Sequence, residues 1–312
     1  MNIGIIGVGG IGGYFGGKLT KLLKNDGQEK DLNIYFVARN KHLEEIKKNG
    51  LILSNQEEGE FVCKPTLATD NFEDLPQLDL CFLCVKSYDL NNSLNLLRNK
   101  IKDDTKIIPL LNGIDIYDRV RAVIPNGVIY PACAYVGTHI ERYGKVSQVG
   151  GSCTILFGSD PANPDVYPQD ILDLFDASNI KYKWCKQPNV EIWSKYIFIA
   201  AYGMVTASEN KTMGQVLESP YLSDKVMEIM REIEKIARKL GIDLSDNIVE
   251  ESFNKGRGFT YETKTSFHRD FEQKNKQNEA ELFGDSIIRI GSQLEVEIPV
   301  SIIVNQKLKI TM

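Results

Sequence analysis

The stretch NIGIIGVGGIGGYFGG at residues 2–17 decides the fold of this chain. It opens on a short apolar run typical of a buried β-strand, and a helix is predicted over Gly10–Leu23. Between them, Gly7, Gly9 and Gly12 form the pattern G-x-G-x-x-G. The first glycine permits a tight turn, the second lets a pyrophosphate approach the backbone, and the third lets the helix pack on the strand. The pattern predicts a dinucleotide site at the helix N-terminus, with a purely structural glycine-rich turn as the alternative.

Short apolar runs alternate with helical patterns through the first half of the chain. Strands are predicted over 33–38, 78–85 and 106–111, because each is a continuous apolar run between polar residues. Such alternation is typical of a mostly parallel sheet with helices on both faces. The β-rich segment 127–158 is expected to append antiparallel strands to this sheet.

The second half of the chain is helical in pattern. A long apolar helix is predicted over 191–207, and apolar residues at spacings of three and four predict an amphipathic helix over 224–240. A polar, proline-marked stretch precedes both. We therefore expect an α/β Rossmann-type domain over residues 1–187 and an all-α domain over residues 188–312, close to the usual domain size of about 150 residues.

The composition excludes several function classes. The 312 residues carry 37 Lys+Arg against 42 Asp+Glu, a formal net charge of −5, and 42% of them are hydrophobic. Such a chain has no general attraction for nucleic acid or anionic membranes, so neither is an expected partner. No segment has the roughly 18 apolar residues of a membrane span and no secretory signal is present, so the cytoplasm is the expected location.

The cysteines and histidines do not show a metal-ligand pattern. Six cysteines are scattered along the chain, which is typical of free thiols in a reducing compartment. Cys81 and Cys84 spell C-x-x-C, but residues i and i+3 of a strand point to opposite faces, so zinc or disulfide chemistry is the minority interpretation. His42, His139 and His268 are equally scattered, and no metal site is predicted.

The end of the second strand indicates which dinucleotide binds. An NAD site usually ends this strand with an acidic residue that binds the ribose 2′-hydroxyl. Here the strand ends at Arg39, whose guanidinium suits a 2′-phosphate, so NADP(H) is the predicted cofactor and a solvated arginine is the alternative.

Two further residues follow later strands, at the sheet edge where such folds bind ligands. Lys86 is expected to reach the phosphate or ribose of the cofactor. Asn112 is expected to face the nicotinamide or the substrate, and an ordinary Asn-Gly turn is an equally good interpretation of the residues alone.

Together these motifs resemble the ketopantoate reductases, also called 2-dehydropantoate 2-reductases. The resemblance covers essentially the whole chain and rests on IGIIGVGGIGGYFGG at 3–17, VAR at 37–39, CVKSYD at 84–89, LLNGID at 110–115, EIWSKYIF at 191–198, TSFHRD at 265–270, NEAEL at 278–282 and IPV at 298–300. It implies the NADPH-dependent reduction of ketopantoate, a small 2-keto acid, to pantoate in pantothenate biosynthesis.

The resemblance also implies roles for matching residues. Lys195 is implied to be the general acid that protonates the keto oxygen, and loss of solvation among aromatic neighbours would make its ammonium a better proton donor. Without the resemblance, a lysine that reaches from an apolar helix to solvent is the favoured interpretation. Glu279 is implied to bind the substrate hydroxyl, with Glu281 as the competing assignment. Asn112 is implied to lie between cofactor and lysine, and Ser266 to bind the substrate carboxylate.

The substrate half departs from the family pattern. Asparagines that often follow the catalytic lysine are replaced by Ile199 and Gly203, and the spacing from Ser266 to Glu279 is one residue longer. A reductase of a different small 2-keto acid and a non-catalytic NADPH-binding paralogue are therefore the alternatives. A homodimer is compatible with the long apolar helices, although an internal core accounts for them equally well.

Overall fold

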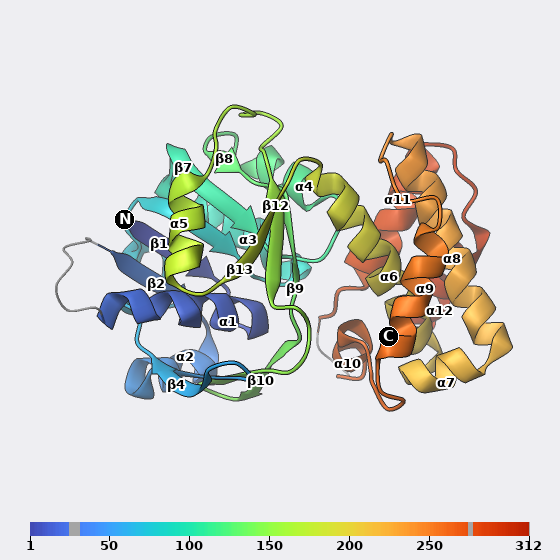
Figure 1. Ribbon diagram of the computed structural model, residues 1–312, viewed down its shortest axis with the longest axis horizontal. Coiled ribbons are helices and arrows are strands. Elements are labelled where there is room, and N and C mark those ends of the chain that lie inside the picture. Colours follow the sequence, from blue (N-terminus) through green and yellow to red (C-terminus); the bar gives the residue numbers. More distant parts are fainter. Residues whose placement is uncertain (25–31, 274–276, 312) are drawn as a thin grey trace. The chain divides into compact units, whose positions relative to one another are not determined.

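The computed structural model describes residues 1–24, 32–273 and 277–311, and the chain divides into two compact units (Figure 1). The first unit holds residues 1–111 and 116–188, and the second holds residues 112–115 and 189–312. The short Asn112–Asp115 segment therefore belongs with the helical half of the chain, an assignment that the expected division after residue 187 does not contain.

The first unit is built on a six-stranded parallel sheet with the order β5-β2-β1-β6-β7-β8. Its strands are β1 (Asn2–Ile6), β2 (Asn33–Val37), β5 (Leu67–Thr69), β6 (Leu78–Leu83), β7 (Ile101–Pro109) and β8 (Val128–Ile129). The strand order reverses between β1 and β6, as in the Rossmann fold, where ligands bind beyond the carboxyl ends of the strands at this reversal. The predicted fold class, a Rossmann-type α/β domain with an all-α domain, is confirmed.

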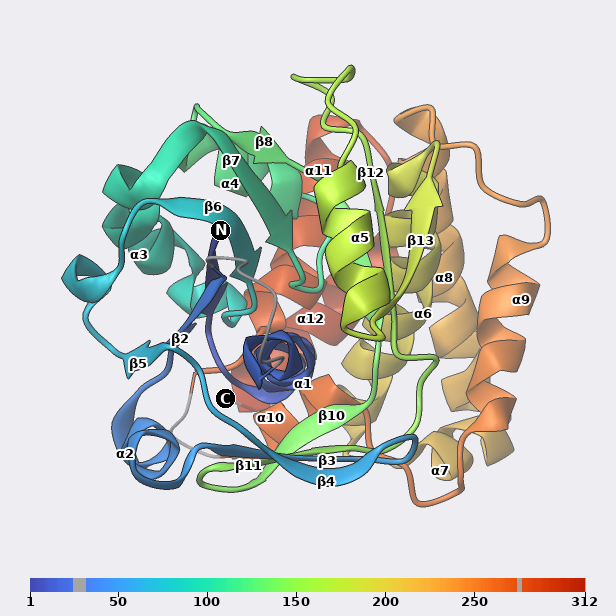
Figure 2. The same ribbon diagram turned by 60° about the vertical axis from the view of Figure 1, so that its left-hand side comes forward.

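Helix α1 (Gly10–Leu19) packs on the six-stranded sheet and also on a four-stranded sheet of order β10-β11-β3-β4; Figure 2 shows the helix nearly end-on. The smaller sheet contains β3 (Leu51–Asn55), β4 (Gly59–Cys63), β10 (Thr138–Arg142) and β11 (Lys145–Gln148). A Cβ added to Gly16 would lie 3.0 Å from the Ile5 side chain in β1, and one added to Gly13 would lie 2.7 Å from Val146 in β11. The additional glycines of this stretch therefore let α1 approach both sheets closely.

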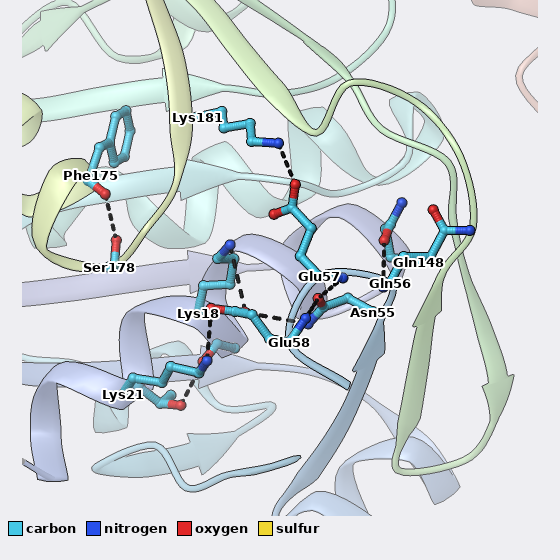
Figure 3. Close-up of polar contacts among 12 residues, drawn as sticks. Lys18, Lys21, Asn55, Gln56, Glu57, Glu58, Gln148, Phe175, Ser178 and Lys181 are labelled. Atoms are coloured by element: carbon cyan, nitrogen blue, oxygen red, sulfur yellow. Dashed lines mark hydrogen bonds and ion pairs between the residues drawn. The ribbon is translucent and has the colours of Figure 1, made fainter. Parts of the chain in front are cut away.

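A charged cluster also ties α1 and its continuation to the turn between β3 and β4 (Figure 3). Lys18, only 1% exposed, lies 3.7 Å from the Glu58 carboxylate, and Lys21 lies 2.9 Å from it. Asn55 Oδ1 shapes the turn by accepting hydrogen bonds from the backbone N–H groups of Glu57 and Glu58. Burial raises the pKa of Glu58, but the two lysines and Asn55 outweigh burial and hold that pKa below its ordinary value.

The β-rich segment 127–158 corrects one expectation. It does not append antiparallel strands to the parallel sheet, because β8 joins that sheet in parallel and the later strands join other sheets. β9 (Ala132–Tyr135), β12 (Thr154–Gly158) and β13 (Lys181–Cys185) form a third sheet, while the β10–β11 hairpin pairs with β3. Apolar alternation predicts that a segment is a strand, but strand partners are set by packing between distant parts of the chain.

The remaining helices of the first unit connect or follow these strands. They are η1 (Thr20–Lys24), α2 (Asn40–Asn49), η2 (Phe72–Asp74), α3 (Ser87–Leu97), η3 (Arg98–Lys100), α4 (Ile116–Val123) and α5 (Gln169–Ala177). Phe175 in α5 packs against Phe82 in β6 with ring centroids 6.1 Å apart, within the core that α1 also closes. Figure 2 shows α3 and α4 on the other face of the sheet from α1 and α5.

The second unit is helical and packs around α6 (Pro188–Glu209), whose middle and end are buried. It also contains α7 (Met213–Glu218), α8 (Pro220–Lys239), α9 (Ile248–Lys255), η4 (Gly256–Gly258), α10 (Ser266–Phe271), the π-helix η5 (Glu281–Asp285), α11 (Ser286–Gln293) and α12 (Pro299–Thr311). Helix α8 begins four residues earlier than the sequence predicts, because the Ser219 hydroxyl accepts a hydrogen bond from the Leu222 N–H and Pro220 fits the first turn.

Asp160 is a fully buried carboxylate that ties α4 to the edge of the six-stranded sheet. It accepts hydrogen bonds from Tyr117 Oη at 2.7 Å, from Arg121 Nη2 at 2.6 Å and from the backbone N–H of Ile129 at 2.9 Å. Burial by itself raises the pKa of a carboxyl. The hydrogen bonds from Asn163, Tyr117 and the backbone outweigh burial here, so the pKa of Asp160 lies below its ordinary value.

Replacing this carboxylate is expected to destabilise the protein. Asp160→Asn should lower the free energy of unfolding at neutral pH by about 2–4 kcal/mol, because Arg121 and its neighbours lose a charged acceptor. Because the folded-state pKa is depressed, this stabilisation is fully present above the unfolded pKa of about 3.9 and is lost as the pH falls below it. Urea titrations across this range measure both effects, with the exposed Asp165→Asn as the control. A difference from wild type that stays constant down to low pH would contradict the role of the charge.

Candidate functional site

The turn between β1 and α1 requires glycine at two of its three pattern positions. Gly7 has a φ of +94°, and an added Cβ there would lie 2.8 Å from the backbone nitrogen of Val85, just past β6. A Cβ added to Gly12 would lie 2.3 Å from the carbonyl oxygen of Gly7. At Gly9, by contrast, nothing lies within 4 Å of an added Cβ. Packing within the fold therefore accounts for glycine at positions 7 and 12. At Gly9 no protein atom occupies the space that a side chain would take.

The start of α1 suits an anion. Gly9 is the N-cap, no side chain caps the helix, and no acidic residue lies in the first turn. The N–H groups of a first helical turn lack intrahelical acceptors, and the helix dipole adds partial positive charge there. The open space beside Gly9 and these N–H groups together form a cradle that fits a pyrophosphate.

Arg39 lies two residues past β2, and its side chain is 63% exposed. Both terminal nitrogens of its guanidinium donate hydrogen bonds to the Asp89 carboxylate, Nη1 at 3.1 Å and Nη2 at 2.5 Å. This hydrogen bonding raises the pKa of Arg39. Asp89 lies in the first turn of α3, and half-buried Lys86 is the N-cap of that helix. The structure thus brings Arg39 to the same short segment that carries Lys86. Sequence analysis missed Asp89, although the motif CVKSYD contains it.

The second unit brings Lys195 and Asn112 together, 83 residues apart in the chain. Lys195 Nζ donates a hydrogen bond to Asn112 Oδ1 at 2.7 Å, and Lys195 is only 8% exposed. The lysine is therefore held by α6 and does not extend into solvent. An amide oxygen accepts a hydrogen bond without carrying a net charge, so Asn112 fixes the position of the Lys195 amino group. This is the arrangement that a general acid needs.

Glu279 is buried, whereas the competing Glu281 is exposed. The backbone N–H groups of Leu282 and Phe283 donate to the Glu279 carbonyl at 3.0 and 3.1 Å, where the chain enters the π-helix η5. Tyr196, next to the lysine in α6, donates its hydroxyl to the Leu282 carbonyl at 2.8 Å. The segment after Glu279 is therefore anchored to the turn of α6 that carries the lysine. Such π-helical turns are frequent at functional sites.

Ser266 is exposed and occupies the first position of α10. Thr265, not Ser266, caps this helix by accepting a hydrogen bond from the His268 N–H at 3.1 Å. His268 itself is buried against Asn210, with its Nε2 3.0 Å from Oδ1. Burial lowers the pKa of His268, which favours the neutral ring.

Metal and thiol chemistry find no site among the residues that the structure describes. Within 1–24, 32–273 and 277–311, no group of three or more His, Cys, Asp or Glu residues is placed to hold a metal ion. Cys81 and Cys84 are free thiols, and burial raises the pKa of both, so they remain protonated. Over the same ranges, no helix has both the length and the apolar character needed to cross a membrane.

Comparison with known proteins finds relatives along both units. The sequence model described as "Ketopantoate reductase PanE/ApbA" matches residues 3–161, and "Ketopantoate reductase PanE/ApbA C terminal" matches residues 189–310. An uncharacterized oxidoreductase of Bacillus subtilis strain 168, YkpB, is 26% identical over 300 residues, which cover 96% of this chain and 95% of that protein. A 2-dehydropantoate 2-reductase of Streptococcus pyogenes serotype M6 is 24% identical over 302 residues, 96% of this chain and 94% of its own length.

A solved structure shares the fold. The PanE/ApbA family ketopantoate reductase from Ralstonia eutropha JMP134 matches with a TM-score of 0.87 and 20% sequence identity, over 100% of this chain and 98% of that one. At this identity the match speaks for the fold alone.

The glycine turn gives a paired prediction. Gly9→Ala should leave the thermal unfolding temperature within a few degrees, because its methyl group meets open space, and should weaken NADPH binding by about tenfold or more by occupying the cradle. Gly12→Ala should lower both stability and affinity, because its methyl group collides with the turn. Calorimetry and fluorescence titration with NADPH measure the two quantities.

Gly258→Ala is the matched control, since an added Cβ also meets open space there, in the other unit. Unchanged NADPH affinity in Gly9→Ala would show that the cradle does not bind the cofactor.

Proposed function

This chain belongs to the ketopantoate reductase family, as an oxidoreductase of that family, and we propose that it catalyses the NADPH-dependent reduction of ketopantoate to pantoate. The observation that carries the proposal is the hydrogen bond between buried Lys195 and Asn112. It fixes the position of the Lys195 amino group on α6, a helix that contains the family's Trp-x-Lys motif. Such a group is suited to protonate the oxygen of a ketone while the adjacent carbon is reduced.

The cofactor half of the proposal rests on residues of the first unit. The cradle at Gly9 and the N-terminus of α1 fit a pyrophosphate, and Arg39 presents a planar fork for a 2′-phosphate. Lys86, at the start of α3, is suited to contact the phosphate or ribose. When bound, NADPH supplies the hydride. Because Arg39 holds Asp89 in the structure, a 2′-phosphate competes with that carboxylate for the guanidinium.

The proton is the contribution of the second unit. Lys195 donates it to the keto oxygen and thereby stabilises the alkoxide that develops there. Asn112 keeps Nζ in one position, so the lysine does not lose its alignment while the reaction proceeds. Glu279 binds the substrate hydroxyl, and Ser266 the substrate carboxylate, as the family resemblance implies.

A second candidate substrate is favoured by the surface of α6 beyond Lys195. One and two helical turns later, on the same face, lie Ile199 and Gly203. A Cβ added to Gly203 would lie 3.5 Å from the Phe267 side chain, so an apolar ring flanks this position. Because side chains that would hydrogen-bond a substrate hydroxyl are replaced here, a 2-keto acid with a purely hydrocarbon side chain is the alternative.

The decisive measurement is the loss of NADPH absorbance with ketopantoate, run beside pyruvate and 2-ketoisovalerate. Turnover that is highest with ketopantoate is expected. Lys195→Ala should lower kcat by about 10²–10⁴-fold, the usual contribution of a general acid, with NADPH affinity unchanged. Lys255→Ala, which removes an exposed lysine of α9, is the matched control.

Other outcomes redirect the proposal. Faster turnover with 2-ketoisovalerate would assign the hydrocarbon class of substrate. NADPH binding without turnover on any keto acid would identify a non-catalytic cofactor-binding protein. Retained turnover in Lys195→Ala would remove that residue from proton transfer.

Arg39 should set the cofactor preference. Arg39→Ala is expected to weaken NADPH binding by about tenfold or more and to leave NADH binding nearly unchanged, because a 2′-phosphate is present in only one of them. Asp89→Asn should strengthen NADPH binding, since it frees the guanidinium. Fluorescence titrations at low and high salt measure both, with Arg98→Ala as an exposed control. Equal losses for NADH and NADPH would show that Arg39 does not read the 2′-phosphate.

A further inference from the structure

The segment that carries Asn112 is only four residues long, and it is held at both ends. Asn112 Oδ1 accepts the hydrogen bond of Lys195 at its start, and Arg289 of α11 donates to Asp115 Oδ2 at its end. Between them, Ile114 packs against the apolar core of the helical unit. These contacts explain why the segment belongs to the second unit although the chain on either side of it belongs to the first.

The backbone of residues 112–115 allows a movement at Asp115 to change the position of Asn112. Gly113, directly after Asn112, has a φ of +139°, a conformation that other residues rarely adopt and that glycine leaves easily. Asn112 and Asp115 are three residues apart, a span of at most about 11 Å in extended chain. A shift at Asp115 therefore reaches Asn112 directly. The position of Lys195 Nζ matters for the reaction, because a displacement of a catalytic group by about 1 Å can lower the rate of the chemical step by about 10²-fold.

We propose that Arg289 is a positioning residue for proton transfer: through Asp115, it keeps Asn112 Oδ1 on Lys195 Nζ. The inference rests on the proposed function only in that Lys195 is taken as the proton donor. Arg289 acts through Asp115 and Asn112 and does not touch the reacting atoms.

The pair is poorly suited to a purely stabilising role. Arg289 is 47% exposed and Asp115 11% exposed, and ion pairs that are open to solvent on one side add little to the free energy of unfolding. Loss of the pair should therefore leave the protein folded and change the alignment of Lys195.

The first test is kinetic. Arg289→Gln and Asp115→Asn should each lower kcat by about tenfold or more while NADPH affinity and unfolding temperature stay close to wild type. The alkaline limb of the kcat–pH profile should also move to lower pH, because the acceptor that favours the protonated amine is displaced. The charge-swapped pair Arg289→Asp with Asp115→Arg should recover part of kcat. Arg231→Gln is the matched control, since Arg231 is 45% exposed and forms an ion pair with Glu228 in the same unit.

The second test needs no turnover. An amine-reactive reagent such as trinitrobenzenesulfonate, followed by peptide mass spectrometry, measures how fast Lys195 is modified in the absence of substrate. Arg289→Gln should raise this rate severalfold, and Arg231→Gln should leave it unchanged.

The two tests separate this inference from the proposed function. A faster modification of Lys195 in a protein that reduces no keto acid would support the positioning role and overturn only the activity. An unchanged modification rate and an unshifted pH profile in Arg289→Gln would overturn the positioning role, whatever the activity of the wild-type protein.

Discussion

Close packing of α1 against two sheets is the constraint on which the first unit depends. The helix approaches the six-stranded sheet at Gly16 and the four-stranded sheet at Gly13, where an added Cβ would lie 3.0 Å from Ile5 and 2.7 Å from Val146. Lys18 of α1 forms an ion pair with Glu58 in the turn between β3 and β4. This pair helps to fix the rotation of α1 about its own axis, in addition to its distance from the sheets. Since the proposed phosphate cradle is the N-terminus of this helix, packing several residues away fixes the geometry of the proposed cofactor site.

In the second unit, the corresponding constraint is the hydrogen bond from Lys195 to Asn112. The amide of Asn112 accepts this hydrogen bond and orients the Lys195 amino group without adding a charge. The apolar surroundings of α6 strengthen this hydrogen bond by excluding water.

The features that were predictable from the sequence are local ones. The glycine pattern, the alternation of strands and helices, and the apolar helix that carries Lys195 each depend on residues that are close in sequence. The fold class follows from them. Interactions between distant residues were not predictable. Apolar alternation over 127–158 identified strands but not their partners, and the exposed Arg39 gave no sign of Asp89, 50 residues later. Asp115 and Arg289 lie 174 residues apart, and neither belongs to a pattern that points to the other.

Residues 112–115 belong to the helical unit although their neighbours in the chain belong to the first unit, and this affects how such proteins can evolve. A helical half that begins at residue 189 lacks Asn112, which accepts a hydrogen bond from Lys195 but precedes most of the second unit in the chain. Exchange of domains between relatives therefore preserves the Lys195–Asn112 hydrogen bond only where the loop from one parent is compatible with α6 and α11 from the other. Specificity for new substrates is therefore expected to evolve by point substitutions along α6 more readily than by recombination between the two units of the fold.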